Sequence, residues 1–296
     1  MKKSETSIPF LLQVPKVKTV IGRMDFVIDR CKGKRVLHLG CVDEGLTQER
    51  IKSGSLLHTR LMGVAKEVWG VDIGAEGIKL LREHGIDNLV VGNIKQLDQI
   101  EELKQQNFDI ILLTEVLEHL NNPGLFLQSV KKLFSPDTVM IITIPNGLRL
   151  TGLGYTLRGY EFVHSDHNYW FSYKTLDTLL KKNGYQIDEM LVYSFFDYTV
   201  PLLKKISEKI RHVFRISKTQ TALEIANAKL NESNKEDKSP SIRQKILKTV
   251  LLSAKWVLEF LIRRYLYHRN LFFVSDGIIV VVKTIVISEK MSGRNK

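Results

Sequence analysis

Cysteine is nearly absent from this sequence of 296 residues, which contains only Cys31 and Cys41. Two cysteines exclude a disulfide-stapled fold and indicate a reducing compartment. No apolar run is long enough to span a bilayer, because 249–262 contains Lys255 and Glu259 and falls short of the roughly 20 residues required. No targeting segment is recognisable. We therefore expect a cytoplasmic protein, with peripheral contact to a membrane as an alternative.

The sequence does contain enough apolar mass for a folded core, with 44% hydrophobic and 26% charged residues. Lys and Arg number 44 against 32 Asp and Glu, which gives a net charge of +12. The segment 202–270 carries most of this excess, with 16 basic and 6 acidic residues. An anionic partner would therefore meet this segment.

Short apolar runs alternate with helical patterns through the first two-thirds of the chain. The strand-like runs are nearly continuous, as in strands covered on both faces. They lie at 35–40, 68–73, 89–91, 109–113 and 138–144, and later at 185–193 and 277–283. Helical patterns occupy 55–66, 75–84, 123–133 and 175–182. This alternation predicts an α/β fold with a doubly wound, mostly parallel sheet of seven strands, whose ligands bind at the carboxyl ends of the strands.

The chain divides into four parts. Residues 1–34 form an N-terminal segment with a helical pattern over 17–28, residues 35–198 form the α/β core, and residues 271–296 form the final strand and a tail. Between core and final strand, two amphipathic stripes predict a basic helical hairpin over 199–270.

Three roles stay open for the basic hairpin. It serves as a lid or homodimer surface, as a contact for anionic lipid head groups or a lipid-linked substrate, or as a nucleic-acid surface. Nucleic acid ranks last, because aromatic residues do not interleave with the basic ones as they do on a base-stacking platform.

The ends of the first two strands suit a nucleoside-containing ligand. V-L-H-L-G-C-V-D-E-G (36–45) places Gly40 in a tight turn, which lets the backbone approach a ligand. V-D-I (71–73) places Asp72 where a carboxylate accepts both hydroxyls of a ribose, with Ile73 beside the base. A helix N-cap is the alternative role of Asp72, and the two roles are compatible.

Longer motifs follow at F-D-I-I-L-L-T-E-V-L-E-H-L-N-N-P (108–123), V-M-I-I-T-I-P-N (139–146) and H-S-D-H-N-Y-W-F-S-Y-K-T-L-D-T-L-L-K-K-N-G-Y (164–185). Together with the two strand ends, they resemble class I S-adenosylmethionine-dependent methyltransferases. The similarity is to the branch that includes ubiquinone-pathway O-methyltransferases, with a type 11/23-like methyltransferase domain. It covers about 35–195 and the final strand, but not 202–270.

The resemblance implies a Rossmann-like fold and S-adenosylmethionine as cofactor. His38 replaces the acidic residue that is usual two positions before Gly40, Val42 replaces a usual glycine, and Asn93 replaces a usual aspartate. The amide oxygen of Asn93 can still accept from the exocyclic amine of adenine. The residues implied in cofactor binding are His38, Gly40, Cys41, Asp72, Ile73, Asn93, Ile94, Thr114 and Glu115.

Methyl transfer from a sulfonium requires alignment, exclusion of water and, for a hydroxyl acceptor, removal of a proton. It requires no protein nucleophile, and the sequence shows no nucleophile elbow. Histidine titrates near neutral pH and suits the removal of a proton. The candidate bases are His167, His119 and His164, with loop histidines bonded to the backbone as the alternative.

The run E-x-x-E-H contains Glu115, Glu118 and His119. With His164 or His167 as a distant partner, it resembles a divalent-metal site of this branch and of small-RNA 2′-O-methyltransferases. Mg²⁺ there would lower the pKa of a substrate hydroxyl. We do not assign the metal, because many metal-free relatives carry this run as part of the cofactor pocket.

The main hypothesis is therefore O-methylation of a small-molecule, glycan or lipid-linked acceptor. Two alternatives stay open. One is a non-catalytic binding or membrane-docking protein, suggested by the altered glycine turn. The other is a metal-dependent RNA 2′-O-methyltransferase.

Overall fold

A computed structural model describes the chain over residues 11–195, 257–258, 260–262, 264–266 and 271–285. The chain divides into two compact units, one of 1–195 with 271–296 and the other of 196–270. The first unit contains the sheet and the site discussed below.

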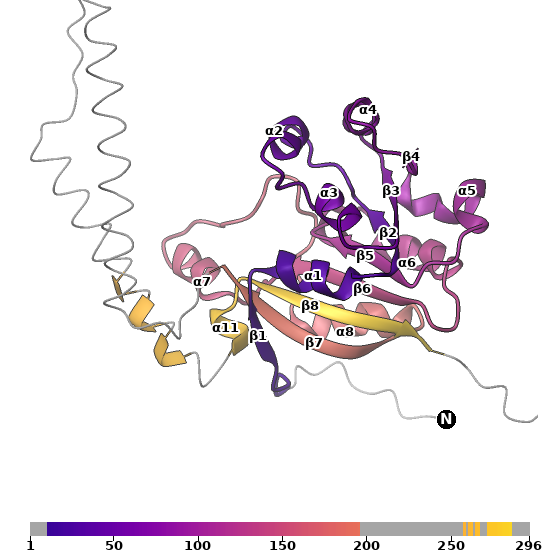
Figure 1. Cartoon of the computed structure of the whole chain (residues 1–296). Coiled ribbons are helices and arrows are strands. Elements are labelled where there is room, and N and C mark those ends of the chain that lie inside the picture. The colour runs from indigo at the N-terminus through magenta and orange to yellow at the C-terminus, as the bar shows by residue number, and fades with distance from the viewer. Residues whose placement is uncertain (1–10, 196–256, 259, 263, 267–270, 286–296) are drawn as a thin grey trace, which may run out of the picture. The chain divides into compact units, whose positions relative to one another are not determined.

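Eight strands form one sheet in the order β1-β7-β8-β6-β5-β2-β3-β4 (Figure 1). The strands are β1 (Lys18–Ile21), β2 (Arg35–Leu39), β3 (Glu67–Asp72), β4 (Leu89–Val91), β5 (Ile110–Thr114), β6 (Val139–Pro145), β7 (Tyr185–Ser194) and β8 (Gly277–Thr284). β8 runs antiparallel to β6 and β7, whereas the other neighbours in the sheet are parallel. The predicted α/β fold with a mostly parallel sheet is confirmed, but the sheet has eight strands instead of the predicted seven.

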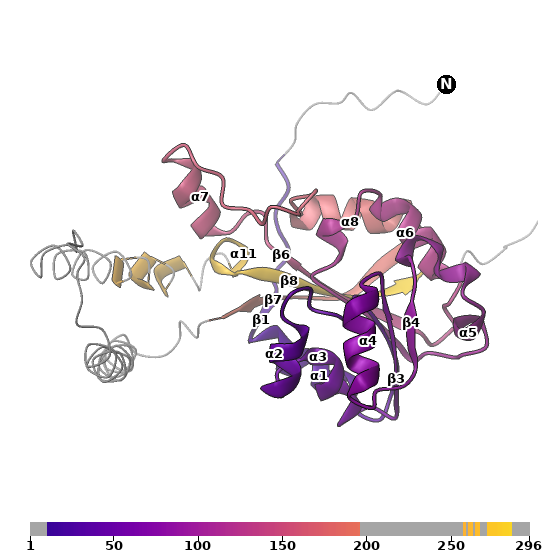
Figure 2. The ribbon, with the colours of Figure 1, turned by 90° about the horizontal axis from the view of Figure 1, so that it is seen from above.

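Two layers of helices cover the sheet. The helices are α1 (Arg23–Cys31), α2 (Thr47–Lys52), α3 (Leu57–Met62), α4 (Ala75–Glu83), α5 (Glu101–Lys104), α6 (Pro123–Lys131), α7 (Leu150–Thr156), α8 (Tyr173–Lys182) and α11 (Leu271–Val274), with the 3₁₀ helices η1 (Ile94–Gln99) and η2 (Leu117–His119). α1 and α3 pack on one face through Val27 and Leu61, and α6 and α8 pack on the other through Phe126 and Leu176 (Figure 2). Burial on both faces explains why the strands read as continuous apolar runs.

The strand order reverses at β2, because β3 and β4 lie on one side of it and β5 and β6 lie on the other. In an open α/β sheet such a reversal leaves a crevice at the carboxyl ends of the strands. The residues that follow β2, β3 and β5 therefore meet at one place, although they are distant in sequence.

The N-terminal helix begins later than its sequence pattern predicts. A helix was expected over 17–28, but Lys18–Ile21 form a strand, β1, which pairs in parallel with β7. This is the strand that was not expected from the sequence. Gly22 follows with a φ of 71°, and its N–H donates to the carbonyl of Ser194 at 3.0 Å. The free edge of β7 offers unpaired backbone groups to this segment. Three of its four residues, Thr19, Val20 and Ile21, are β-branched and favour a strand.

The predicted basic hairpin over 199–270 lies almost wholly outside the described residues and stays a prediction. Within its unit, residues 257–258, 260–262 and 264–266 are helical. Among the described parts of the chain, no helix combines the length and the apolar character needed to cross a bilayer.

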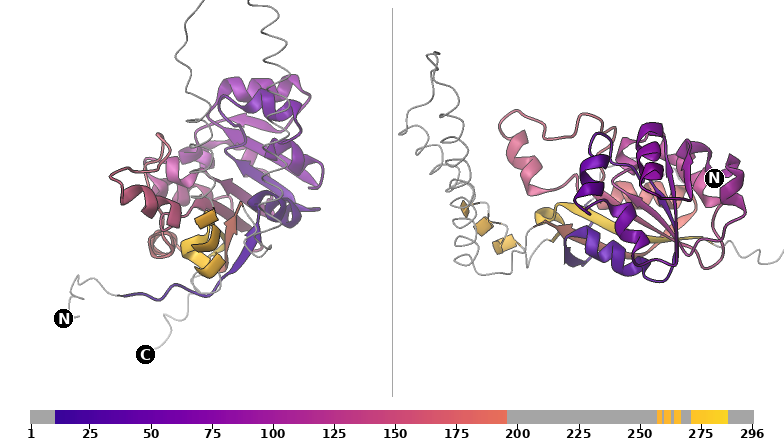
Figure 3. Two further views of the ribbon diagram at one scale, coloured as in Figure 1. Left: turned by 90° about the vertical axis from the view of Figure 1, so that its left-hand side faces the viewer. Right: turned by 45° about the horizontal axis from the view of Figure 1, so that its top comes forward.

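α7 follows β6 and stands apart from both helical layers (Figure 3). It has no buried residue. The chain after α7 returns to the sheet through 164–172, which brings His164 and His167 of the later motif close to His119 of η2.

Candidate active site

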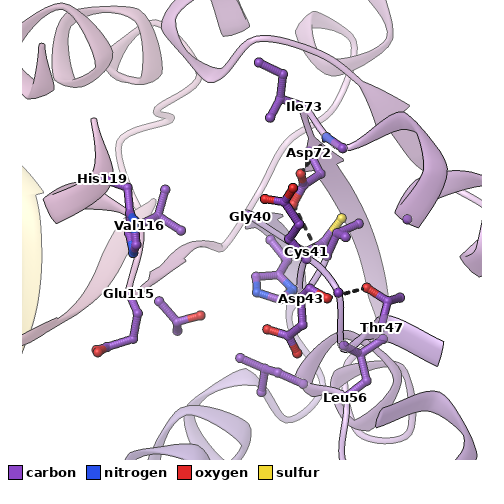
Figure 4. Close-up of a pocket in the computed structure, with 18 of the residues that line it drawn as sticks. Gly40, Cys41, Asp43, Thr47, Leu56, Asp72, Ile73, Glu115, Val116 and His119 are labelled. Atoms are coloured by element: carbon purple, nitrogen blue, oxygen red, sulfur yellow. Dashed lines mark hydrogen bonds between the residues drawn. The ribbon is translucent and has the colours of Figure 1, made fainter. Parts of the chain in front are cut away.

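A cavity of about 950 Å³ lies where the strand order reverses. Its size is typical of a site for a small organic ligand. Figure 4 shows Gly40 and Asp72 on one side of it and Glu115 and His119 facing them across the space. All residues predicted to bind the cofactor line it, namely His38, Gly40, Cys41, Asp72, Ile73, Asn93, Ile94, Thr114 and Glu115. His119 lines it too, but His164 and His167 do not belong to the lining.

The turn after β2 requires glycine for two reasons. Gly40 has a φ of 74°, and a Cβ there would lie 2.5 Å from Cγ2 of Val116. Its N–H donates to the carbonyl of Val71 at 2.9 Å. The backbone of the turn therefore reaches the cavity, and Val116 from the opposite wall closes against it.

Val42 stands where a glycine is usual, yet it does not close the cavity. A Cβ on Gly77 of α4 would lie 2.1 Å from Cγ1 of Val42, so Val42 occupies space that Gly77 leaves open. The side chain of Val42 therefore packs against Gly77 of α4. This arrangement weakens the argument that an altered glycine turn indicates a non-catalytic protein.

Asp72 bonds two backbone groups and still lines the cavity. Its Oδ2 accepts from the N–H of Val42 at 2.9 Å, and its Oδ1 accepts from the N–H of Gly74 at 2.9 Å. Gly74 is the N-cap residue of α4. A carboxylate has about four acceptor sites, so each oxygen can take one further bond from a ribose hydroxyl. Next to it the apolar side chain of Ile73 is 75% exposed, which suits contact with a flat base.

Glu115 is held by residues that the sequence analysis missed. Its φ of 53° is unusual for a residue other than glycine. Its Oε1 accepts from the hydroxyl of Thr143 at 2.9 Å and from that of Tyr193 at 3.1 Å. The Nε of Arg23 lies 3.8 Å away. These partners come from β6, β7 and α1, and no local spacing in the sequence indicates that they meet.

Glu118 is a buried acid in η2, with a side chain 1% exposed. Neither oxygen has a hydrogen-bond partner among the described residues. The pKa of Glu118 is raised to about 8, mainly by burial and secondly by the charge of Glu115. Its carboxyl is therefore protonated at neutral pH, and its Oε1 lies 4.0 Å from Nε2 of His167.

Three histidines gather beside this wall of the cavity. The ring of His119 lies 4.5 Å from that of His167 and 5.6 Å from that of His164, centroid to centroid. Nδ1 of His119 lies 2.9 Å from Oδ2 of Asp166. The pKa of His167 is lowered to about 4, mainly by burial and secondly by the neighbouring His119. His167 is therefore neutral at physiological pH.

The residues present do not form the oxygen-rich site that Mg²⁺ prefers. Among the described residues, the group whose potential ligand atoms lie within 4.8 Å of one another is His119, His164 and His167. Glu115 instead bonds the hydroxyls of neighbouring strands. Three imidazoles suit transition metals such as zinc better than magnesium. Of the glutamates in the predicted metal set, Glu118 lies beside these histidines, with its Oε1 4.0 Å from Nε2 of His167, and the metal-dependent RNA alternative stays a prediction.

A family model for a methyltransferase domain matches residues 22–190, which is more than half of the chain. The chain belongs to this methyltransferase family. It is a class I S-adenosylmethionine-dependent methyltransferase by family, and S-adenosylmethionine is the cofactor of that family. The glycine turn after β2 and the acidic residue that ends β3 both line the cavity and fit this cofactor, because they suit its amino-acid tail and its ribose.

Known relatives match only part of this methyltransferase. The ubiquinone biosynthesis O-methyltransferase of Glaesserella parasuis serovar 5 (strain SH0165) is 30% identical over 133 residues, which are 42% of this chain and 52% of the relative. The mitochondrial ubiquinone biosynthesis O-methyltransferase of Rattus norvegicus is 24% identical over 177 residues, 55% of this chain and 48% of the relative. The chain thus spans about half the length of these curated relatives.

Among solved structures, a SAM-dependent methyltransferase from Archaeoglobus fulgidus is similar, with a TM-score of 0.46 and 16% identity. The alignment covers 88% of this chain and 91% of that one.

Proposed function

We propose that this protein transfers the methyl group of S-adenosylmethionine to a hydroxyl of a small-molecule, glycan or lipid-linked acceptor. The observation that carries the proposal is the position of His119. It lines the cavity opposite Asp72, and a carboxylate orients its ring. The names of the relatives, ubiquinone biosynthesis O-methyltransferases, support oxygen as the atom methylated.

The two walls of the cavity have different roles, one in cofactor binding and the other at the reacting atoms. Asp72 binds the ribose hydroxyls, Ile73 contacts the adenine, and the Gly40 turn meets the amino-acid tail. When bound, the cofactor supplies a methyl group on a sulfonium, which is a good leaving group. The wall of Glu115 and His119 then faces the reacting atoms. Alignment of acceptor oxygen, methyl and sulfur is the main catalytic contribution that this geometry makes.

We assign the removal of the acceptor proton to His119 rather than to His167. A hydrogen bond from Nδ1 to Asp166 leaves Nε2 of His119 as the acceptor for a substrate proton, and the carboxylate stabilises the imidazolium that forms. His167 is a poor proton acceptor at neutral pH, because its pKa is lowered to about 4, and it lies outside the cavity lining. His167 and His164 pack around His119 and restrict its ring.

The test is a search for the methylated product. Extracts of small molecules, glycans and lipids are incubated with the protein and with S-adenosylmethionine that carries a deuterated methyl group. Mass spectrometry should find the label on oxygen in one extract, and Asp72→Ala should abolish it. Label on nitrogen or carbon, or no label in any extract, would overturn the proposal.

A further inference from the structure

Glu115 holds a backbone conformation that its residue type disfavours. Its φ of 53° lies in the left-handed region, where residues other than glycine are uncommon. Such a conformation persists only where the surrounding structure imposes it, and it is concentrated at active sites and ligand clamps. The N–H of Glu115 donates to the carbonyl of Thr143 at 2.9 Å, which ties the residue to β6. The conformation therefore indicates that the position of this side chain matters for function.

The two carboxylate oxygens of Glu115 have different surroundings. Oε1 accepts from the hydroxyls of Thr143 and Tyr193, at 2.9 and 3.1 Å. Oε2 accepts from no group in the described part of the chain, yet it keeps access to solvent, in contrast to both oxygens of Glu118. Because Glu115 lines the cavity, Oε2 is the oxygen that is left for a ligand.

Tyr193 reaches Glu115 because a glycine lies beneath its ring. Tyr193 of β7 pairs with Gly277 of β8, and a Cβ at Gly277 would overlap Cε1, Cζ and the hydroxyl oxygen of the tyrosine. A glycine inside a strand often marks such a close approach. On the other side, Cζ of Arg23 lies 5.5 Å from the centroid of the ring. The phenol is thus fixed between β8 and α1, with its hydroxyl directed at Glu115.

The hydroxyl of Tyr193 remains a donor at neutral pH. The pKa of Tyr193 is raised above its ordinary value, mainly by burial and secondly by the charge of Glu115. Each oxygen of a carboxylate offers about two acceptor sites. The hydroxyls of Tyr193 and Thr143 therefore occupy Oε1 and leave Oε2 open.

The other acidic residues of the cavity are less suited to a cationic ligand group. They are Asp43, Glu44, Asp72, Glu76 and Asp166. Asp43 and Asp166 each have a side-chain partner, and Asp72 bonds two backbone N–H groups. The two remaining acids are exposed to water, which screens their charge. Glu115 combines partial burial with an unbonded oxygen, and it belongs to the same wall as His119.

We propose that Tyr193 positions Glu115 so that Oε2 of Glu115 faces the positive charge at the reacting centre of the cofactor, the methylated sulfonium. This inference rests on the proposed function, in which the wall of Glu115 and His119 faces the reacting atoms (Figure 4). It does not depend on the identity of the acceptor. Glu115 is a binding residue, and Tyr193 is a positioning residue that acts through it.

The contact would select the cofactor over its product. S-adenosylmethionine carries the sulfonium charge, whereas S-adenosylhomocysteine has a neutral sulfur. A carboxylate in a partly enclosed site attracts the charged ligand and gains nothing from the neutral one. Because the charge is lost during transfer, the contact favours replacement of product by cofactor and does not itself accelerate the chemical step.

Calorimetry with two ligands that do not react measures this selectivity. They are S-adenosylhomocysteine and sinefungin, an analogue with a protonated amine in place of the methylated sulfonium. The quantity compared is the ratio of the two Kd values, with EDTA present so that no divalent metal occupies the carboxylate. Glu115→Gln, which keeps the shape of the side chain, should lower the preference for sinefungin about 10-fold or more, the size of one charge-assisted hydrogen bond. The Kd of S-adenosylhomocysteine should stay within a few-fold of native.

Two tyrosine variants separate positioning from stability. Tyr193→Phe removes only the hydroxyl and should lower the same preference about 3- to 10-fold, the range for one neutral hydrogen bond. The matched control is Tyr185→Phe. Tyr185 is also fully buried, and its hydroxyl donates to the carbonyl of Leu127 at 2.7 Å, but neither residue lines the cavity. Both variants should lose stability, and only Tyr193→Phe should change the ratio of Kd values.

If Glu115→Gln or Tyr193→Phe weakens both ligands equally, or weakens neither, the contact with the reacting centre is wrong. If Tyr185→Phe changes the ratio as much as Tyr193→Phe does, the positioning role of Tyr193 is wrong. If the native protein binds neither ligand, the placement of the cofactor in this cavity fails together with this proposal. An unchanged ratio in a protein that does bind S-adenosylhomocysteine would overturn this proposal alone.

Discussion

The two walls of the cavity are built in different ways. The wall of Gly40 and Asp72 comes from the ends of two adjacent strands, β2 and β3, and its hydrogen bonds join residues close to those ends. The wall of Glu115 and His119 combines β5 and η2 with side chains from α1, β6 and β7 and with the loop that carries Asp166. The first wall is a local motif, and the second is a tertiary assembly. We therefore expect cofactor binding to depend on the first wall and turnover on the second.

The largest separation of the two functions is expected at His119. His119→Asn removes the proposed base and should lower kcat about 100- to 10,000-fold, the range for a general base. The Kd of S-adenosylhomocysteine should stay within a few-fold of native. The measurement is steady-state kinetics on the acceptor found by mass spectrometry, together with calorimetry. Asp166→Asn should lower kcat less, because the imidazole remains. An equal loss of cofactor affinity and kcat would contradict the assignment of cofactor binding to the first wall and turnover to the second.

The converse change is Asp72→Ala. It removes the proposed acceptor of both ribose hydroxyls and should weaken binding of S-adenosylhomocysteine about 100-fold. It also leaves the N–H groups of Val42 and Gly74 without their acceptor, so the melting temperature should fall. Asp72→Asn keeps one acceptor oxygen and separates the two effects. The exposed control Asp137→Ala should change neither. Native affinity in Asp72→Ala would refute the role of this residue.

Gly40 and Val116 are the point where the two walls touch. Gly40→Ala introduces a Cβ into Cγ2 of Val116 and forces alanine into the left-handed region. The strain should lower the free energy of unfolding by about 1–2 kcal/mol. The double variant with Val116→Ala removes the clash but not the φ strain, so it should recover part of the loss. Denaturant unfolding measures both, and full recovery would show that the backbone conformation costs nothing there.

A last effect concerns the dependence of stability on pH and involves neither cofactor binding nor turnover. Because the pKa of Glu118 rises from 4.5 to about 8 on folding, the folded protein holds a proton that the unfolded chain releases between these pH values. The stability that this proton provides is present below pH 4.5 and is lost as the pH rises through about 8. Glu118→Gln should therefore gain thermal stability relative to native at pH 8 but not at pH 4.5. The exposed control Glu83→Gln should show no such trend. A gain that is equal at both pH values would contradict a buried, protonated Glu118.

The sequence predicts the first wall better than the second for a physical reason. Continuous apolar strands, Gly40 and Asp72 are local signals, and the structure brings Gly40 and Asp72 together on one wall of the cavity. Arg23 and Tyr193 reach Glu115 only through the folded sheet.

β1 escaped prediction for the same reason. Its helix-like pattern is overridden by the open edge of β7, which lies more than 160 residues away in sequence, and by the left-handed Gly22 that ends the strand. Local pattern indicated the helix, but tertiary pairing determined the strand.

A crystal structure of the full chain with S-adenosylhomocysteine tests the central claim most directly. We predict both ribose hydroxyls within hydrogen-bond distance of the Asp72 carboxylate, and the sulfur turned toward the wall of Glu115 and His119. A ligand bound elsewhere, or an Asp72 that contacts only the N–H groups of Val42 and Gly74 while the ligand occupies the cavity, would contradict the account.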